Sequence, residues 1–211
     1  MRHIFLIAAL LALVSSPALA ARSRVDDARS IVEAEDYINA RRTIASKFIQ
    51  TTDDGQTVTG TLLISRPGRM NLSYDTPLKD FIIADGSFIY MWDGELEQST
   101  TIPLGGSLAD LILRENLRLD GDVRVTNIKH GSKTVEITVA EAKNPDVGTM
   151  TLLFETEPFI LHGWRVQDAQ NRTTTIALQG MREGVDIPER SFRFIPPKLG
   201  KSTKTDKPIN K

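Results

Sequence analysis

The chain has 211 residues, no cysteine, 26 Lys and Arg against 27 Asp and Glu, and a formal net charge of −1. Without cysteine it forms no disulfide, thiolate metal site or cysteine nucleophile, and it lacks the thiol that carries the lipid of a bacterial lipoprotein. The balanced charge does not suggest a nucleic-acid binder, and the length fits one domain.

The first twenty residues have the three parts of a secretory signal. Arg2 supplies the positive charge, residues 4–14 are apolar, and Ala18-Leu19-Ala20 fits a cleavage site. We therefore expect residues 1–20 to be a signal peptide and the mature chain to be soluble, because the apolar run is shorter than the roughly 20 residues of a membrane-spanning helix. An anchor helix retained after export is the alternative.

The next segment changes from a helical to a strand-like period. Residues 26–40 predict an amphipathic helix, because apolar side chains recur at helical spacing among acidic ones. These apolar residues are Ile31, Val32, Ala34, Tyr37 and Ile38. Beyond them, residues 47–51 and 57–65 flank Asp53-Asp54-Gly55 and predict a β-hairpin.

Further short apolar segments follow, separated by turns centred on glycine or asparagine. They predict strands at 70–74, 81–84, 88–92, 123–128, 135–139, 149–154, 161–166, 173–178 and 192–195. About ten short strands at near-even spacing favour one antiparallel meander, and a twisted sheet of that length tends to curl. The fold class is therefore mainly β with a few helices.

One segment interrupts this pattern with a helix signal. Ser107-Leu108-Ala109-Asp110 is a capping-box pattern, and it predicts a short helix that continues through Leu111, Ile112 and Leu113. A helix lying over a curled sheet can act as a lid, and we expect Leu108, Leu111 and Ile112 to be its lid residues.

Signals for catalysis or metal binding are weak. After the signal the chain has only His130 and His162, which lack metal-ligand spacing. No Gly-x-Ser-x-Gly elbow, P-loop or dinucleotide fingerprint occurs. Acidic pairs such as Glu95 and Glu97 fit turn chemistry. The sequence predicts no catalytic residue, no metal site and no cofactor.

The apolar strand faces carry the strongest functional signal. Met70, Leu72 and Tyr74 share one face of their strand, and Phe88-Ile89-Tyr90-Met91-Trp92 places its three rings on one face. Two interpretations stay open: an ordinary core, or the lining of a site for variable apolar ligands, which is typically rich in aromatic and methionine side chains. The predicted cavity residues are Phe48, Leu62, Ile64, Met70, Leu72, Tyr74, Phe81, Phe88, Tyr90, Trp92, Met150, Leu152 and Phe154.

Arg66-Pro67-Gly68-Arg69 places two guanidinium groups on either side of a Pro-Gly turn between apolar strands. One interpretation is a turn with solvated basic ends. The other is that Arg66 lies at the rim of an apolar cavity and donates its N–H groups to helix-end carbonyls or to a ligand headgroup.

The last fourteen residues, 198–211, form a tail that is rich in lysine and poor in apolar residues. This composition predicts a disordered, solvated segment. Contact with anionic membrane lipids is the functional alternative.

Taken in order, several of these residues resemble the LolA family of periplasmic carriers of outer-membrane lipoproteins. The matching residues are Phe48-Ile49-Gln50-Thr51, Gly60, Ser65-Arg66-Pro67-Gly68-Arg69-Met70, Tyr74, Pro77, Ala84-Asp85-Gly86, Tyr90, Trp92-Asp93, Glu97-Gln98, Gly163-Trp164-Arg165-Val166, Asp168, Thr174, Leu178, Phe192-Arg193-Phe194 and Pro196-Pro197. The resemblance implies that residues 21–197 form an incompletely closed antiparallel β-barrel of about eleven strands with a helical lid over an apolar cavity.

The resemblance also implies a function. It implies a monomeric periplasmic shuttle that takes triacylated lipoproteins from an inner-membrane ABC transporter to an outer-membrane receptor, with no covalent chemistry. An arginine at the position of Arg66 is associated in this family with holding the lid closed.

Two other functions remain as alternatives. The first is a periplasmic regulatory domain of the same fold that senses lipid or mislocalised lipoprotein. The second, an enzyme such as a lipid hydrolase, lacks an evident nucleophile–base set. The outer-membrane receptor of similar fold is disfavoured because the chain has no cysteine to carry its lipid.

Overall fold

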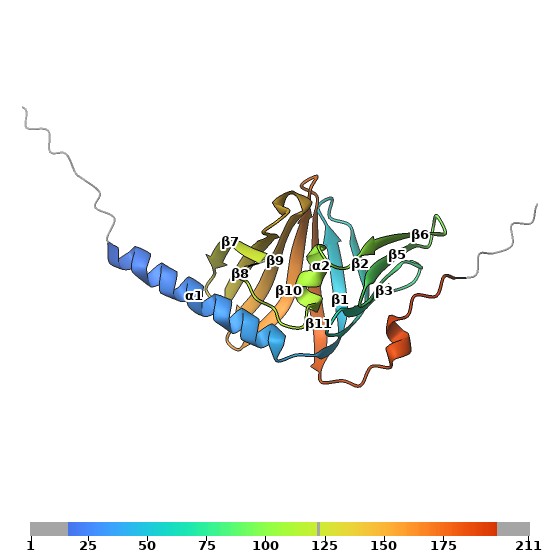
Figure 1. Cartoon of the computed structure of the whole chain (residues 1–211), viewed down its shortest axis with the longest axis horizontal. Helices are drawn as coiled ribbons and strands as arrows, with labels where there is room; N and C mark the ends of the chain where they lie inside the picture. Colours follow the sequence, from blue (N-terminus) through green and yellow to red (C-terminus); the bar gives the residue numbers. More distant parts are fainter. Residues whose placement is uncertain (1–16, 122, 198–211) are drawn as a thin grey trace, which may run out of the picture.

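One antiparallel sheet of eleven strands forms the frame of the molecule, in a computed structural model that describes residues 17–121 and 123–197 (Figure 1). The strands are β1 (Thr43–Thr52), β2 (Thr57–Ser65), β3 (Arg69–Tyr74), β4 (Phe81–Asp85), β5 (Phe88–Asp93), β6 (Gln98–Pro103), β7 (Val123–His130), β8 (Thr134–Glu141), β9 (Gly148–Thr156), β10 (Phe159–Asp168) and β11 (Thr173–Glu183). The helices are α1 (Pro17–Asn39), α2 (Leu108–Leu113) and the 3₁₀ turns η1 (Pro145–Val147) and η2 (Glu189–Phe192).

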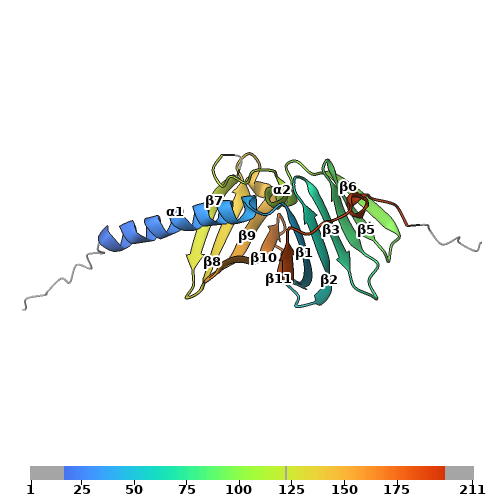
Figure 2. The same cartoon turned by 90° about the horizontal axis from the view of Figure 1, so that it is seen from below.

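The sheet is two meanders joined at the middle. Its strand order is β6-β5-β4-β3-β2-β1-β11-β10-β9-β8-β7, and the join is the pairing of β1 with β11, where Phe48 lies opposite Leu178. The edge strands β6 and β7 do not pair with each other, so the curled sheet stays open. Both α-helices lie across its concave face (Figures 1 and 2). The predicted fold, an incompletely closed antiparallel barrel covered by helices, is confirmed.

The hairpin around Asp53-Asp54-Gly55 and the helix capped by Ser107 both form as predicted. The Ser107 Oγ accepts from the Asp110 backbone N–H at 3.3 Å, while the Asp110 carboxylate pairs with Arg114 at 2.6 Å. Both elements were predictable because a hairpin turn and a helix cap are set by a few neighbouring residues.

One predicted strand does not form, and one observed strand was not predicted. Residues 192–195 form no strand: Phe192 ends η2, which lies against the outer face of β3 and β4, and the next residues continue the C-terminal segment (Figure 2). Pro188, Pro196 and Pro197 have no backbone N–H to donate to a ladder, which disfavours a strand here. Conversely, β6 pairs with β5 although all its residues are exposed, so it has no apolar face that a pattern could reveal.

Helix α1 packs against the sheet by its C-terminal half. Ala34, Tyr37 and Ile38 are buried, and the Tyr37 ring meets the Phe154 ring edge-on at a centroid distance of 5.7 Å. Val32 is exposed, so its assignment to the apolar face was wrong; it points away because it lies off the stripe set by Ala34, Tyr37 and Ile38.

The two terminal predictions lie mostly outside the described residues. Of the expected signal peptide, residues 1–16 fall outside, and the backbone of 17–20 belongs to α1. The lysine-rich segment 198–211 also falls outside. In the ranges 17–121 and 123–197, no helix is both long and apolar enough to cross a membrane.

Gly60 in β2 makes room for the ring of Phe48. A Cβ at this position would lie 2.5 Å from the Phe48 ring and 2.3 Å from the Ser73 carbonyl oxygen. Gly60→Ala is therefore expected to lower the free energy of unfolding by roughly 2–3 kcal/mol, because the rigid backbone oxygen cannot move aside cheaply. A lower urea midpoint at constant m-value would show this.

Gly105→Ala is the matched control. No heavy atom lies within 4 Å of a Cβ at Gly105, so we expect a change within about 0.5 kcal/mol. An equal loss of stability in the two variants would contradict the close approach at Gly60.

Candidate functional site

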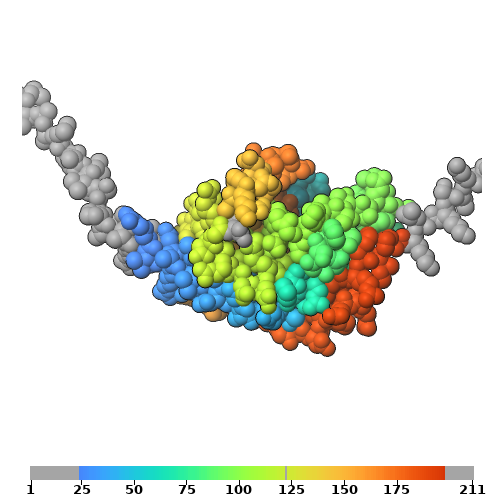
Figure 3. Space-filling view, viewed as in Figure 1, coloured from blue at the N-terminus to red at the C-terminus, as the bar shows by residue number. Residues whose placement is uncertain are grey.

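An apolar cavity of about 290 Å³ opens between α2 and the concave face of the sheet. Figure 3 shows a recess between the green atoms of the β6–α2 region and the yellow and orange atoms of later strands. The lining residues are Gln50, Met70, Leu72, Tyr74, Ile82, Ile89, Met91, Ile102, Ser107, Leu108, Ala109, Ile112, Met150, Trp164, Val166, Thr174 and Ile176.

Strand register brings the lining together on one side of the sheet. Leu72 of β3 lies opposite Ile82 of β4, which lies opposite Met91 of β5. Because side chains alternate between faces, residues two positions along each strand join the same row. The floor of the cavity is thus a continuous apolar surface over β3, β4 and β5.

Several predicted residues lie at this cavity. Met70, Leu72, Tyr74 and Met150 contribute from strands, and Leu108 and Ile112 contribute from α2. Leu62, Ile64 and Ile112 line a second, smaller void of about 20 Å³, together with Tyr37 and Arg66. The remaining predicted residues of this face are buried in the same core but line neither space; they are Phe48, Leu111, Leu152 and Phe154.

Four predicted cavity residues lie on the other face of the sheet, so their assignment is corrected. They are Phe81, Phe88, Tyr90 and Trp92. Phe81 stacks on Trp92 with centroids 6.2 Å apart, and Phe194 of the C-terminal segment stacks on Tyr90 at 4.6 Å. These rings cover the outside of the sheet beneath the C-terminal segment, and Phe88 remains 44% exposed.

Sequence reasoning missed Ile82, Ile89 and Met91 as lining residues. A signal for the last two was present, because β5 is apolar on both faces and its alternation does not indicate which face turns inward. The sequence interpretation chose the aromatic face as the lining, but the face of β5 that lines the cavity carries Ile89 and Met91.

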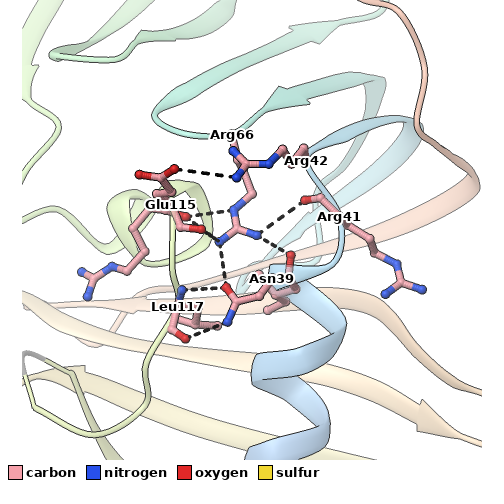
Figure 4. A network of polar contacts seen from close by, with 8 residues as sticks. Asn39, Arg41, Arg42, Arg66, Glu115 and Leu117 are labelled. Atoms are coloured by element: carbon pink, nitrogen blue, oxygen red, sulfur yellow. Dashed lines mark hydrogen bonds and ion pairs between the residues drawn. The ribbon is translucent and has the colours of Figure 1, made fainter.

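Arg66 lies between the C-terminal ends of the two helices, at 5% exposure (Figure 4). Its guanidinium donates to the Ile38 carbonyl and the Asn39 Oδ1 (3.2 Å) at the end of α1. It also donates to the carbonyls of Arg114 (3.0 Å from Nε) and Glu115 (3.3 Å) just after α2. The carbonyls among these acceptors lie at or just beyond helix C-termini, where backbone oxygens lack intrahelical partners.

The neighbouring backbone and Asn39 strengthen this junction. The Gly68 N–H donates to the Leu113 carbonyl at 2.7 Å. Asn39 bonds both backbone groups of Leu117, accepting at 2.7 Å and donating at 3.0 Å. The β2–β3 turn, the end of α1 and the segment after α2 are therefore joined by one polar network in an otherwise apolar region.

Burial, and to a lesser extent the nearby Arg42 cation, lower the pKa of Arg66. Removing a guanidinium from water is costly unless its N–H groups are paired, and here carbonyl oxygens and one amide oxygen pair with them. The interaction depends on the helix ends staying in place, because the acceptors are mostly backbone atoms. Arg66 can make all of these bonds only while the end of α1 and the segment after α2 lie side by side.

The two histidines that follow the expected signal peptide lie away from the cavity. His130 pairs with Asp27 at 2.7 Å, and His162 lies 3.6 Å from Glu155, in both cases on partly exposed surface. Neither histidine lines the cavity. The arrangement of the cavity favours binding apolar chains.

Comparison with known proteins finds a family match, curated relatives and solved structures. Residues 39–195 match the family described as "Outer membrane lipoprotein carrier protein LolA". An outer-membrane lipoprotein carrier protein of Ralstonia nicotianae is 28% identical over 195 residues, covering 85% of this chain and 89% of that protein. One of Pseudomonas entomophila is 25% identical over 197 residues, covering 88% and 93%. A solved LolA superfamily protein from Nitrosomonas europaea is 11% identical with a TM-score of 0.46, covering 79% of this chain and 97% of that one.

Proposed function

Because the chain belongs to the LolA family of outer-membrane lipoprotein carrier proteins, we propose that it binds the acyl chains of lipoproteins in its apolar cavity and carries them through the periplasm. The single observation that supports this most is the apolar cavity on the concave face, covered by a helix that Arg66 holds at one end. No step of this function requires a covalent reaction.

The energetics of transport fit such a cavity. Each acyl CH₂ removed from water contributes about 0.8 kcal/mol, so long chains need a cover in an aqueous compartment. A carrier must also release its cargo, and a cover with two positions of similar free energy makes release accessible. The small void of about 20 Å³ is lined by residues of both α1 and α2, so movement of the helices would enlarge it.

The proposed path has a membrane partner at each end. Triacylated lipoproteins are loaded from an inner-membrane lipoprotein-releasing ABC transporter and handed to an outer-membrane lipoprotein receptor. The carrier works as a monomer, and the proposed signal peptide at residues 1–20 delivers it to the periplasm. The alternative, a lipid-sensing regulatory domain of the same fold, would bind lipid without moving lipoprotein between membranes.

Release of lipoproteins from spheroplasts tests the proposal. Added protein is expected to solubilise newly made triacylated lipoproteins in a complex of one carrier to one cargo, measured by size-exclusion chromatography and immunoblotting. A sensor would bind acyl lipid in the same assay and leave lipoproteins on the membrane. If the protein binds no acyl chain and releases no lipoprotein, the carrier function is wrong.

A further inference from the structure

One end of the apolar cavity contains a pair of polar side chains. Gln50 of β1 and Tyr74 of β3 both line the cavity, and the Tyr74 hydroxyl donates to the Gln50 Oε1 at 2.8 Å. Burial raises the pKa of Tyr74, so the hydroxyl keeps the proton that it donates. This bond fixes the orientation of the amide, because the oxygen faces the tyrosine.

The remaining half of that amide is free. Within the described ranges 17–121 and 123–197, the Gln50 Nε2 has no hydrogen-bond partner, and neither does the Thr174 hydroxyl. Gln50 lies opposite Ile176 in the β1–β11 ladder, which makes Thr174 its diagonal neighbour on the same face. By contrast, the Ser107 hydroxyl at the cavity is used, since it donates to the Leu104 carbonyl at 2.6 Å.

The packing around Tyr74 holds this pair in place. The Phe48 ring passes over Gly60 and meets the Tyr74 ring edge-on at 5.6 Å. The tyrosine therefore reaches across β2, where glycine leaves the space, to the amide on β1. A buried ring contact fixes the side chain that in turn fixes the Gln50 amide.

Gln50 and Thr174, whose side chains carry the two groups without a partner in the described ranges, lie at the rim of the cavity. Gln50 is two residues from the end of β1, and Thr174 is the second residue of β11. Teal and orange atoms of this part of the chain border the recess in Figure 3. A chain that entered the cavity would therefore have its polar end close to these groups.

We propose that the Gln50 amide N–H₂, oriented by Tyr74 and assisted by the Thr174 hydroxyl, binds the carbonyl oxygen that joins an acyl chain to its headgroup. An ester or amide carbonyl is an acceptor without a donor of its own, so it is the complement of this site. A carbonyl drawn into an apolar cavity without a partner costs free energy. The site thus recognises acyl chains as a class, beyond their hydrocarbon. This inference rests on the proposed function, because it concerns the same cavity.

Two ligands that differ at this one group make the test direct. They are 1-hexadecanoylglycerol, an ester, and 1-O-hexadecylglycerol, its ether counterpart without the carbonyl. Binding is followed by tryptophan fluorescence in a Trp92→Phe background, since Trp92 lies on the outer face and Trp164 lines the cavity. The quantity of interest is the ratio of the ether Kd to the ester Kd.

Gln50→Leu is expected to lower this ratio about tenfold, mainly by weakening the ester. Tyr74→Phe keeps the ring and removes the hydroxyl, and is expected to lower the ratio part of the way. The matched control is Gln167→Leu on β10, an exposed glutamine next to the cavity residue Val166, and it should leave the ratio unchanged.

The outcomes separate this inference from the proposed function. If neither ligand binds, acyl-chain carriage itself fails. If both bind and the ratio is the same in the parent, Gln50→Leu and Tyr74→Phe proteins, carriage stands and the carbonyl site is overturned. An unchanged melting temperature in the two variants assigns a changed ratio to the site and not to altered folding.

Discussion

Replacing Arg66 by leucine is expected to leave cargo capture intact and to slow its hand-off to an outer-membrane receptor by about 100-fold. The variant loses the bonds to the carbonyls of Ile38, Arg114 and Glu115. It leaves those of Arg114 and Glu115 without their donor while the helices stay closed, whereas the Ile38 carbonyl still accepts from the Arg41 N–H at 3.1 Å. Hydrogen bonds to a charged group contribute roughly 1.5–3 kcal/mol each, so a bias of about 3 kcal/mol toward the open state is a modest expectation.

The direction of the effect follows from which state the bonds stabilise. We propose that Arg66 stabilises the closed, empty carrier, so that closure favours the departure of cargo. Without it the open, loaded state is favoured, and cargo is held longer. The amount of lipoprotein bound per carrier measures capture. The rate of its transfer to receptor-containing vesicles measures hand-off.

Arg69→Leu is the matched control, because it removes the other arginine of the same turn. Arg69 pairs with Glu189 at 3.2 Å on the outer face and takes no part in the helix junction. Arg66→Lys keeps the charge with a single nitrogen and should fall between leucine and the parent. Unchanged transfer in Arg66→Leu, or an equal loss in Arg69→Leu, would remove the role of Arg66 in closing the cavity.

Met91→Glu is expected to weaken binding of 1-hexadecanoylglycerol by roughly 30-fold or more. Met91 lines the cavity and is half-buried, so the protein tolerates a carboxylate there while the cavity is empty and hydrated. Filling the cavity with an acyl chain takes that carboxylate out of water, which costs several kcal/mol for an unpaired ion. Titration of the ligand against tryptophan fluorescence measures the loss.

Ligand binding by the same variant is expected to depend on pH. Burial by the ligand favours the neutral acid and raises the pKa of the new glutamate in the complex. Binding should therefore recover as the pH falls through the range between the free and bound pKa values. The parent protein, with methionine at this position, should show no such recovery.

Phe88→Glu distinguishes the two faces of β5. Phe88 is on the outer face and 44% exposed, so this variant should bind the ester as the parent does. If the aromatic face lined the cavity, the pattern would be reversed, with Phe88→Glu weak and Met91→Glu normal. That result would overturn the assignment of the inner face to Ile82, Ile89 and Met91.

Local patterns in the sequence were sufficient for most of the elements and for Arg66 as a candidate. Three signals act over a few neighbouring residues: the Asp53-Asp54-Gly55 turn, the Ser107 cap and the change of period after residue 40. They can therefore be recognised without knowing which segments pack against them. Arg66 stood out because a guanidinium between apolar strands needs acceptors. Its acceptors, at the ends of two helices, lie 25 to 49 positions away in sequence.

Only the tertiary structure decided which face of the sheet is the inside. In β5 both faces are apolar, since the inner one meets the cavity and the outer one lies beneath the C-terminal segment with Phe194. A strand covered on both sides loses the polar face that periodicity relies on. The sequence by itself determined the meander and the capped helix, and it marked Arg66 as a candidate without placing it in the interior. The folded chain decided the cavity, because the segment that covers the outer aromatic face comes from about a hundred residues further along.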